Sequence, residues 1–121
     1  MTLLKEQPLL VDYQQFIFDI CKERGWDKRT ITEKMLFMTE EVGEVAKAIR
    51  KELGFDGKKP ETIDHLAEEL VDVLNYVLDI ANNYDIDLES AFRAKWTKNA
   101  TRTWGYDQPS TDAIAENSPK Q

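Results

Sequence analysis

Two segments of this chain carry apolar residues at alternating steps of four and three, and this spacing restricts the fold more than any other feature. In the first segment the series is Ile31, Met35, Met38, Val42, Val45 and Ile49. In the second it is Ile63, Ala67, Leu70, Leu74, Val77 and Ala81. An α-helix has 3.6 residues per turn, so each series lies along one face of a long amphipathic helix.

A shorter apolar pattern and two capping signals place a further helix before these two. The spacing of apolar residues predicts a helix over about residues 9–24, and Gly25 can adopt the left-handed conformation that ends it. Thr30 and Glu33 have the spacing of a capping box, which would open the next helix. That helix is expected to run to near Gly54.

The second half of the chain has its own boundaries. Pro60 suits the first position of a third helix, and Asp87 can cap a fourth that runs to about Arg102. Residues 1–104 are then one helical domain, and the polar, Pro-bearing residues 105–121 are expected to form a flexible tail. No segment shows the alternation of a strand. The sequence therefore predicts an all-α antiparallel bundle of about four helices with short loops.

Composition excludes several classes of protein. The chain has 121 residues and a formal net charge of −7, so one core is expected and a nucleic-acid partner is not. No apolar run approaches the roughly 20 residues that cross a bilayer, so no membrane partner is expected. The first residues lack a secretory pattern, and Cys21 is the only cysteine, which excludes an internal disulfide. These features favour a cytoplasmic protein.

The long helices also carry paired acids. Glu41 and Glu44 lie one turn apart on the first, and Glu69 and Asp72 lie one turn apart on the second. If the helices are antiparallel neighbours the four carboxylates converge, and they would repel by several kcal/mol per close pair at an effective dielectric near about 20. Carboxylate oxygens without His or Cys favour Mg2+, with Mn2+ as a substitute, and such a site suits phosphate chemistry.

Two readings of these acids stay open on the residues alone. Pairs of Glu three residues apart are also common on solvated helix faces, where they bind nothing. Gly43 lies between the first two acids, and a glycine inside a helix costs about 1 kcal/mol relative to Ala. Such a glycine should therefore have a reason, either close approach of another backbone or ligand, or tight helix packing.

The acidic segments resemble a known family. Glu40-Glu41-Val42-Gly43-Glu44-Val45 followed by Glu68-Glu69-Leu70-Val71-Asp72-Val73-Leu74 resembles the ExxE and ExxD motifs of the MazG-type all-α nucleotide pyrophosphohydrolases. The resemblance extends over residues 25–104. It implies Mg2+-dependent hydrolysis of a nucleoside triphosphate to the monophosphate and pyrophosphate, by water and without a covalent nucleophile. It also implies a dimer or a dimer of dimers.

The resemblance assigns roles to individual positions. The metal ligands would be Glu41, Glu44, Glu69 and Asp72, and Glu40 would polarise water or support the ligands. On the fourth helix a basic stripe would contact phosphates or sugar; it consists of Lys95, Lys98 and Arg102, with Asn99 beside it. The alternative for that stripe is a solvated face that complements the helix dipole.

Two further residues are candidates for contacts with the nucleoside. Trp26 could stack on the base, although a tryptophan at a loop–helix junction is more often part of the core. Asn75 lies one turn beyond Asp72 and could hydrogen-bond a sugar or base, or simply line a helix interface. Tyr76 is a candidate for the edge of the site, and His65 is expected at the helix surface or an interface.

The leading hypothesis is a nucleoside triphosphate pyrophosphohydrolase that removes unwanted nucleotides and assembles with copies of itself. The alternatives are a non-catalytic helical interaction module and a regulator that binds metal or nucleotide without turnover. The apolar flanks of both long helices are wider than one chain of this length easily covers, which favours a homodimer or homotetramer.

Overall fold

The computed structural model describes residues 1–54 and 63–103, and within these ranges every regular element is a helix. The elements in chain order are α1 (Leu10–Glu23), the short 3-10 helix η1 (Trp26–Lys28), α2 (Ile31–Glu52), α3 (Ile63–Asn83) and α4 (Leu88–Thr101). The prediction of an all-α fold with four helices is confirmed. The predicted start of the third helix at Pro60 and the predicted tail over 105–121 lie outside the described residues.

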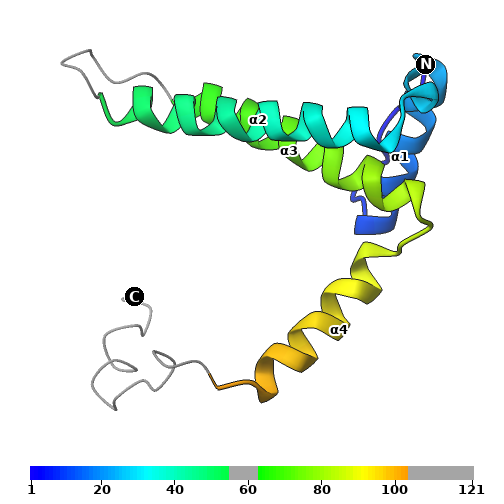
Figure 1. Cartoon of the computed structure of the whole chain (residues 1–121). Coiled ribbons are helices and arrows are strands. Elements are labelled where there is room, and N and C mark those ends of the chain that lie inside the picture. The colour runs from blue at the N-terminus through cyan, green and yellow to red at the C-terminus, as the bar shows by residue number, and fades with distance from the viewer. Residues whose placement is uncertain (55–62, 104–121) are drawn as a thin grey trace. The chain divides into compact units, whose positions relative to one another are not determined.

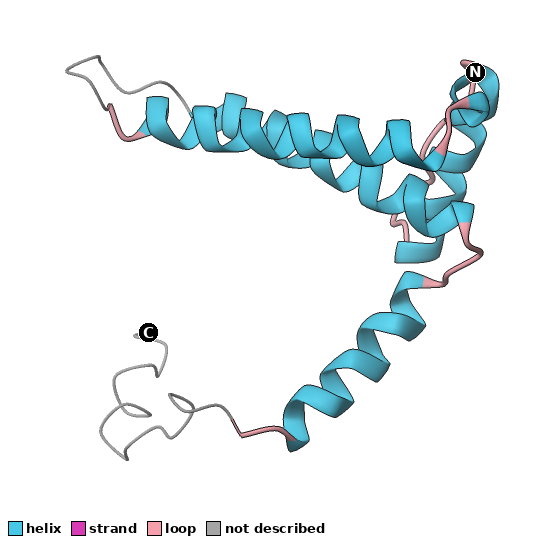
Figure 2. Ribbon diagram, viewed as in Figure 1, coloured by secondary structure: helices cyan, strands magenta, loops and turns pink. Residues whose placement is uncertain are grey.

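The two long helices form an antiparallel hairpin. In Figure 1, α2 and α3 run side by side along their length, and α1 lies across one end of the pair. Figure 2 shows the same arrangement, with loops only at the helix ends. The hairpin brings the middle of α2 against the middle of α3, where each helix carries its paired acids.

The predicted capping signals are present at three helix ends. The Thr30 hydroxyl accepts a hydrogen bond from the Glu33 backbone N–H at 3.1 Å, and the Glu33 carboxylate accepts one from the Thr30 N–H at 3.3 Å. Gly25 has φ of 73°, the left-handed conformation that follows α1. The Asp87 carboxylate accepts a hydrogen bond from the Glu89 N–H at 3.0 Å and so caps α4.

The core is small and lies where α1 meets α3. Ile17, Cys21 and Leu78 are buried there, and four partly buried side chains pack against them: Leu10, Phe16, Trp26 and Leu88. Burial of this cluster positions η1, because the Trp26 ring belongs to it. The segment that joins α1 to α2 is thereby held against α3.

One buried amide ties three parts of the chain together. The Gln14 side chain donates to the Ile86 carbonyl at 2.8 Å and accepts from the Leu88 N–H at 2.9 Å. It also donates to the Asn82 side chain at 3.3 Å, and Asn82 donates back to the Gln14 carbonyl at 2.8 Å. These bonds fix α1 to the end of α3 and to the first turn of α4.

A buried ion pair joins the two long helices. Lys34 on α2 is only 2% exposed, and its Nζ lies 2.9 Å from Asp79 Oδ1 and 2.7 Å from Asn83 Oδ1 on α3. Lysine is rarely buried unless it is paired, and here both partners come from the facing helix. The pair therefore fixes the register of α2 on α3 at the end near α1.

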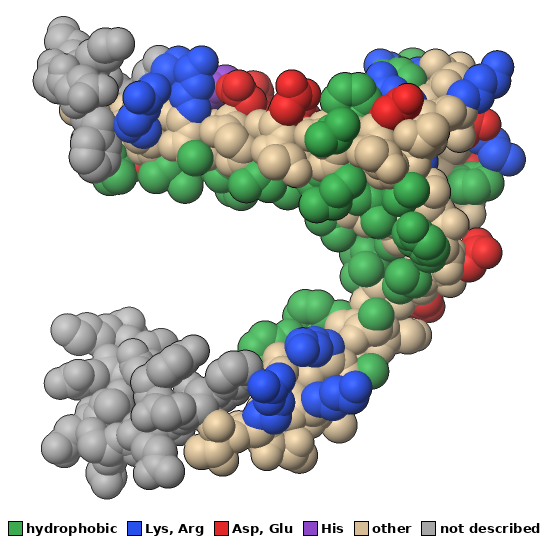
Figure 3. Space-filling view, in the orientation of Figure 1, with side chains coloured by type: hydrophobic (Ala, Val, Ile, Leu, Met, Phe, Trp, Pro, Cys, Tyr) green, Lys and Arg blue, Asp and Glu red, His purple; other side chains and the backbone are tan. Residues whose placement is uncertain are grey.

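The apolar series that predicts the long helices is largely exposed in the single chain. Met35 and Val42 are each 50% exposed and Leu70 is 53% exposed, whereas the buried positions of α2 are Lys34 and Ala48. Figure 3 shows hydrophobic side chains gathered along one side of the hairpin. We call this surface the apolar stripe, and its exposed members on the two helices are Met35, Val42, Ile49, Ile63, Leu70, Leu74 and Val77.

From Phe92 onward the chain forms a second unit, which contains most of α4. Its Phe92 and Trp96 rings pair with centroids 6.3 Å apart. None of the described helices combines the length and apolar character that a bilayer crossing requires.

Candidate functional site

Three of the predicted acidic residues meet between the long helices. One carboxylate oxygen each from Glu41 on α2 and from Glu69 and Asp72 on α3 lie within 4.8 Å of one another. All three residues are partly buried. The two acids on α3 share a face because they are one helical turn apart, and the antiparallel hairpin places Glu41 opposite them.

The negative charges of this cluster repel one another, and a bound cation would balance them. Burial raises the pKa of Glu41, and the negative charges of Asp72, Glu69, Glu44 and Glu40 raise it further. The ligand atoms available are carboxylate oxygens, which hard divalent cations prefer. The donor set therefore fits Mg2+ or Mn2+, and a bound cation would remove the repulsion that the pKa of Glu41 records.

The remaining acids of the motif lie further out. Glu44 and Glu40 are exposed, and Glu44 is outside the group of three although its charge acts on Glu41. His65 extends the cluster toward the start of α3, since its Nε2 lies 3.4 Å from Glu69 Oε1. The sequence predicts His65 at the helix surface or an interface, and the structure places it beside the Glu69 carboxylate.

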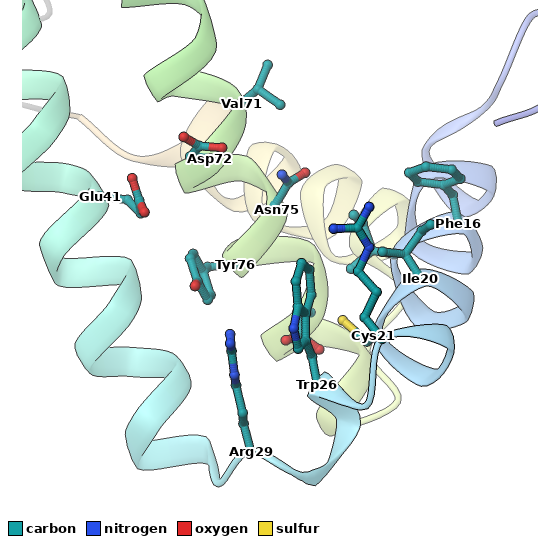
Figure 4. Close-up of a pocket in the computed structure, with 13 residues that line it drawn as sticks. Phe16, Ile20, Cys21, Trp26, Arg29, Glu41, Val71, Asp72, Asn75 and Tyr76 are labelled. Atoms are coloured by element: carbon teal, nitrogen blue, oxygen red, sulfur yellow. The ribbon is translucent and has the colours of Figure 1, made fainter. Parts of the chain in front are cut away.

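A cavity of about 440 Å³ opens beside the carboxylates. Glu41 and Asp72 line one end, and the walls come from α1, η1 and α3 (Figure 4). The aromatic and aliphatic part of the lining consists of Phe16, Ile17, Ile20, Trp26, Val71 and Tyr76. Cavities of this size and mainly apolar lining, with a few polar groups, hold small molecules such as nucleosides.

An arginine stands between two aromatic rings in this cavity. The Arg29 guanidinium lies 5.2 Å from the centroid of Trp26 and 4.9 Å from that of Phe37. Phe37 also contacts Tyr76, with ring centroids 6.2 Å apart. Burial raises the pKa of Tyr76, and the positive charge of Arg29 opposes that rise. In Figure 4, Arg29, Tyr76 and Glu41 follow one another along the cavity.

The sequence-predicted nucleoside residues and phosphate residues fall in different units. Trp26 and Asn75 both line the cavity beside the carboxylates. The predicted phosphate-binding residues Lys95, Lys98, Asn99 and Arg102 all belong to the second unit. Lys95 and Lys98 are exposed there, and the Asn99 side-chain oxygen is shielded from solvent without a hydrogen-bond partner among the described residues.

Sequence reasoning missed several residues of the cavity. The lining residues that the sequence pattern does not single out are Phe16, Ile20, Arg29 and Asp79. One signal for Asp79 was available, because it follows Asp72 by seven residues and so repeats on the same helix face. Arg29 lies in a loop, and nothing in its local sequence indicates that its guanidinium packs between the rings of Trp26 and Phe37.

Comparison with known proteins identifies the family of this chain. Residues 29–104 match the model of the MazG nucleotide pyrophosphohydrolase domain. The chain is 29% identical over 100 residues to the uncharacterised protein YvdC of Bacillus subtilis (strain 168), a match that covers 77% of this chain and 94% of YvdC. It also resembles the crystal structure of YPJD from Bacillus subtilis, named as a candidate pyrophosphatase, with a TM-score of 0.67 and 27% identity. That match covers 82% of this chain and all of YPJD. This chain therefore belongs to the MazG nucleotide pyrophosphohydrolase family.

Proposed function

We propose that this protein hydrolyses nucleoside triphosphates to the monophosphate and pyrophosphate, and thereby removes unwanted nucleotides. One observation carries the proposal: Glu41, Glu69 and Asp72 converge within 4.8 Å beside a cavity of nucleoside size. A site for a divalent cation would bind the phosphates of a nucleotide, and the aromatic pocket next to it would bind the nucleoside. Family membership supports the same class of reaction.

The cation in this proposal is Mg2+, held by Glu41, Glu69 and Asp72 with Glu44 as the fourth ligand. Mg2+ uses few carboxylates and shares the oxygens of substrate phosphates, which suits a half-open cluster better than a closed one. When bound, it supplies positive charge to the phosphate oxygens and acidifies water. Mn2+ has similar ligand preferences and is expected to substitute.

The other proposed roles belong to side chains of this chain. Trp26 stacks on the base, and Asn75 hydrogen-bonds the sugar or base inside the cavity. The α4 residues Lys95, Lys98 and Arg102 supply positive charge to the phosphates, and Asn99 hydrogen-bonds a phosphate or the sugar. Exposed Glu40 acts on the attacking water, which displaces pyrophosphate from the α-phosphorus.

We further propose that the protein works as a homodimer or a dimer of dimers in the cytoplasm. The support for assembly is the apolar stripe, because exposed apolar surfaces of this extent usually mark an interface. The support for the location is that Cys21 is free and buried, because a fold that uses no disulfide suits a reducing compartment.

The first test is a turnover assay with deoxyribonucleoside and ribonucleoside triphosphates and Mg2+, followed by detection of monophosphate and pyrophosphate. Glu69→Gln should lower kcat by at least about a hundredfold, because the neutral amide binds a cation poorly while the helix is retained. Circular dichroism should show unchanged helicity.

Glu68→Gln is the matched control, since Glu68 neighbours Glu69 but its side chain is 79% exposed. It should keep near wild-type turnover. Near wild-type activity in Glu69→Gln would remove that residue from the ligand set. If the wild-type protein hydrolyses no triphosphate but Mg2+ raises its melting temperature, a regulator that binds metal is favoured. If neither occurs, the interaction module is favoured.

A further inference from the structure

The cavity has a third acidic lining residue, Asp79, which lies away from the carboxylate cluster. Asp72, Asn75, Tyr76 and Asp79 all line it and share one face of α3. At 1.5 Å of rise per residue, Asp79 lies about 10 Å along the helix from Asp72. That separation is close to the length of a nucleotide from its α-phosphate to the far edge of its base. A nucleotide held by its phosphate near Asp72 would therefore present its base edge to Asp79.

Asp79 is held in place as a hydrogen-bond acceptor. Buried Lys34 donates to Asp79 Oδ1 at 2.9 Å, and the Asp79 side chain keeps 13% of its surface exposed. An ionised carboxylate has about four acceptor positions, so Lys34 and the Cys21 thiol, which also hydrogen-bonds Asp79, leave capacity for one further donor from the cavity. Lys34 also binds Asn83, which holds the lysine on the α3 surface.

The surroundings of Asp79 make a hydrogen bond at this point selective. The nearby lining from α1 includes Ile17 and Ile20, which offer a base edge no hydrogen-bonding side chain, and Cys21, whose thiol already hydrogen-bonds Asp79. In such surroundings a base that cannot donate to the carboxylate leaves it facing another acceptor, and that loss is larger than in water. An amino group at this point of the base edge can donate to the aspartate, whereas the carbonyl that replaces it in uracil or hypoxanthine is an acceptor, and the donor N–H of those bases lies at the neighbouring ring position.

We propose that Asp79 is a specificity residue that accepts a hydrogen bond from an amino group on the Watson–Crick edge of the base. This inference rests on the proposed function of the same cavity. It predicts that nucleotides of cytosine and adenine are preferred over their oxo counterparts, uracil and hypoxanthine. Lys34 is the positioning residue that keeps the Asp79 carboxylate in place.

The experiment compares kcat/KM for two pairs of substrates, dCTP with dUTP and dATP with dITP, in the presence of Mg2+. Each pair exchanges an amino group for a carbonyl at the same ring position. In the wild-type protein the amino member should be favoured by at least about tenfold. Asp79→Asn should reduce that ratio by about tenfold, because the amide can donate to the carbonyl of the oxo base.

Asp19→Asn on α1 is the matched control, since Asp19 accepts a bond only from neighbouring Gln15 among the hydrogen bonds recorded for the described residues. It should leave both ratios unchanged. A purely structural role for Asp79 would lower all four values together and leave the ratios intact, which would overturn the proposal. Equal kcat/KM values within both pairs for the wild-type protein would also overturn it, and this comparison needs no variant to fold.

A separate measurement distinguishes failure of this proposal from failure of the proposed function. If the wild-type protein hydrolyses none of the four triphosphates, calorimetric binding of dCMP and dUMP decides the question. Tighter binding of dCMP that is lost in Asp79→Asn supports the specificity residue even without turnover. Equal affinity for the two monophosphates, or no binding of either, overturns it.

Discussion

Glu41 shows how a single side chain joins the fold to the proposed chemistry. It is the one member of the three-carboxylate cluster that α2 contributes, and its pKa is raised by burial and by four neighbouring acids. An isolated helix would leave it solvated. Only the packing of α2 on α3 gives it a partly buried position opposite Glu69 and Asp72, where a cation can replace the lost water.

Cys21 offers a prediction at the same scale. Burial, followed by the charge of Asp79, raises the pKa of its thiol from 9.0 to about 11. At pH 8 the folded protein should therefore react with iodoacetamide about a hundredfold more slowly than the urea-unfolded chain, because only the thiolate reacts. Mass spectrometry of the alkylated chain measures both rates.

The sign of the pH dependence follows from that shift. The folded state holds the Cys21 proton more tightly than the unfolded state does, so its contribution to stability is full below pH 9.0 and is lost as the pH rises toward about 11. The alkylation rate of the folded protein should accordingly rise about tenfold per pH unit between pH 8 and 10. Equal rates for the folded and unfolded chains would show that the thiol is not protected.

At the scale of elements, the long helices are the best-predicted part of the molecule. Thr30, Gly25 and Asp87 mark helix ends by local chemistry, and the structure places a boundary at each. Such signals act over a few residues and can be read directly. Which face of each helix is buried cannot be read in this way. The burial of Lys34 depends on Asp79, a residue 45 positions away.

A substitution at Gly43 shows whether another backbone or a ligand lies close to α2. A Cβ added at Gly43 would meet no atom within 4 Å in the described part of the chain, so neither close approach nor tight packing within one chain explains the glycine. Gly43→Ala should therefore stabilise α2 by about 1 kcal/mol and raise the melting temperature by several degrees. Thermal unfolding followed by circular dichroism measures the change.

Ala46→Gly is the reverse control, because Ala46 is exposed on the same helix and should lose a similar amount of stability. A lower melting temperature for Gly43→Ala would mean that another chain packs against this position in the assembly. Unchanged stability with lost turnover would instead indicate a substrate that passes close to the backbone.

The candidate site was predictable in its acidic half and only partly in its aromatic half. The spacing of Glu41, Glu69 and Asp72 contains the information that brings them together once two helices are antiparallel. Arg29 becomes part of the cavity only because Trp26 and Phe37, from η1 and α2, stand on either side of it in space. That arrangement depends on the packing of three elements, and no local pattern records it.

At the scale of the whole molecule, the apolar stripe is a surface that no contact among the described residues covers. A soluble monomer rarely exposes a continuous row of this kind on two adjacent helices. A second copy packed against the row would bury it and would complete the bundle that the sequence predicts. The apolar spacing would then reflect contacts between two copies, whereas the buried pair of Lys34 and Asp79 fixes the packing of α2 on α3 within one chain.

Leu74→Glu tests that interpretation. Leu74 is 45% exposed on α3, and burying a charge against a second apolar stripe would oppose association. Light scattering after size exclusion should give the wild-type protein two or four times the 14.0 kDa of one chain, and the variant a smaller multiple. Thr32→Glu adds the same charge at an exposed position of α2 outside the stripe and should keep the wild-type mass. A wild-type mass of one chain would refute the proposed assembly.

The Gln14 side chain has a consequence for how the polypeptide is made. Its partners Asn82, Ile86 and Leu88 follow it by 68, 72 and 74 positions, so they leave the ribosome long after it does. Until these residues emerge, the Gln14 side chain lacks its hydrogen-bond partners and α1 cannot dock. Docking of α1 is therefore delayed until residues 82–88 have been made, in contrast to chains whose N-terminal parts fold first.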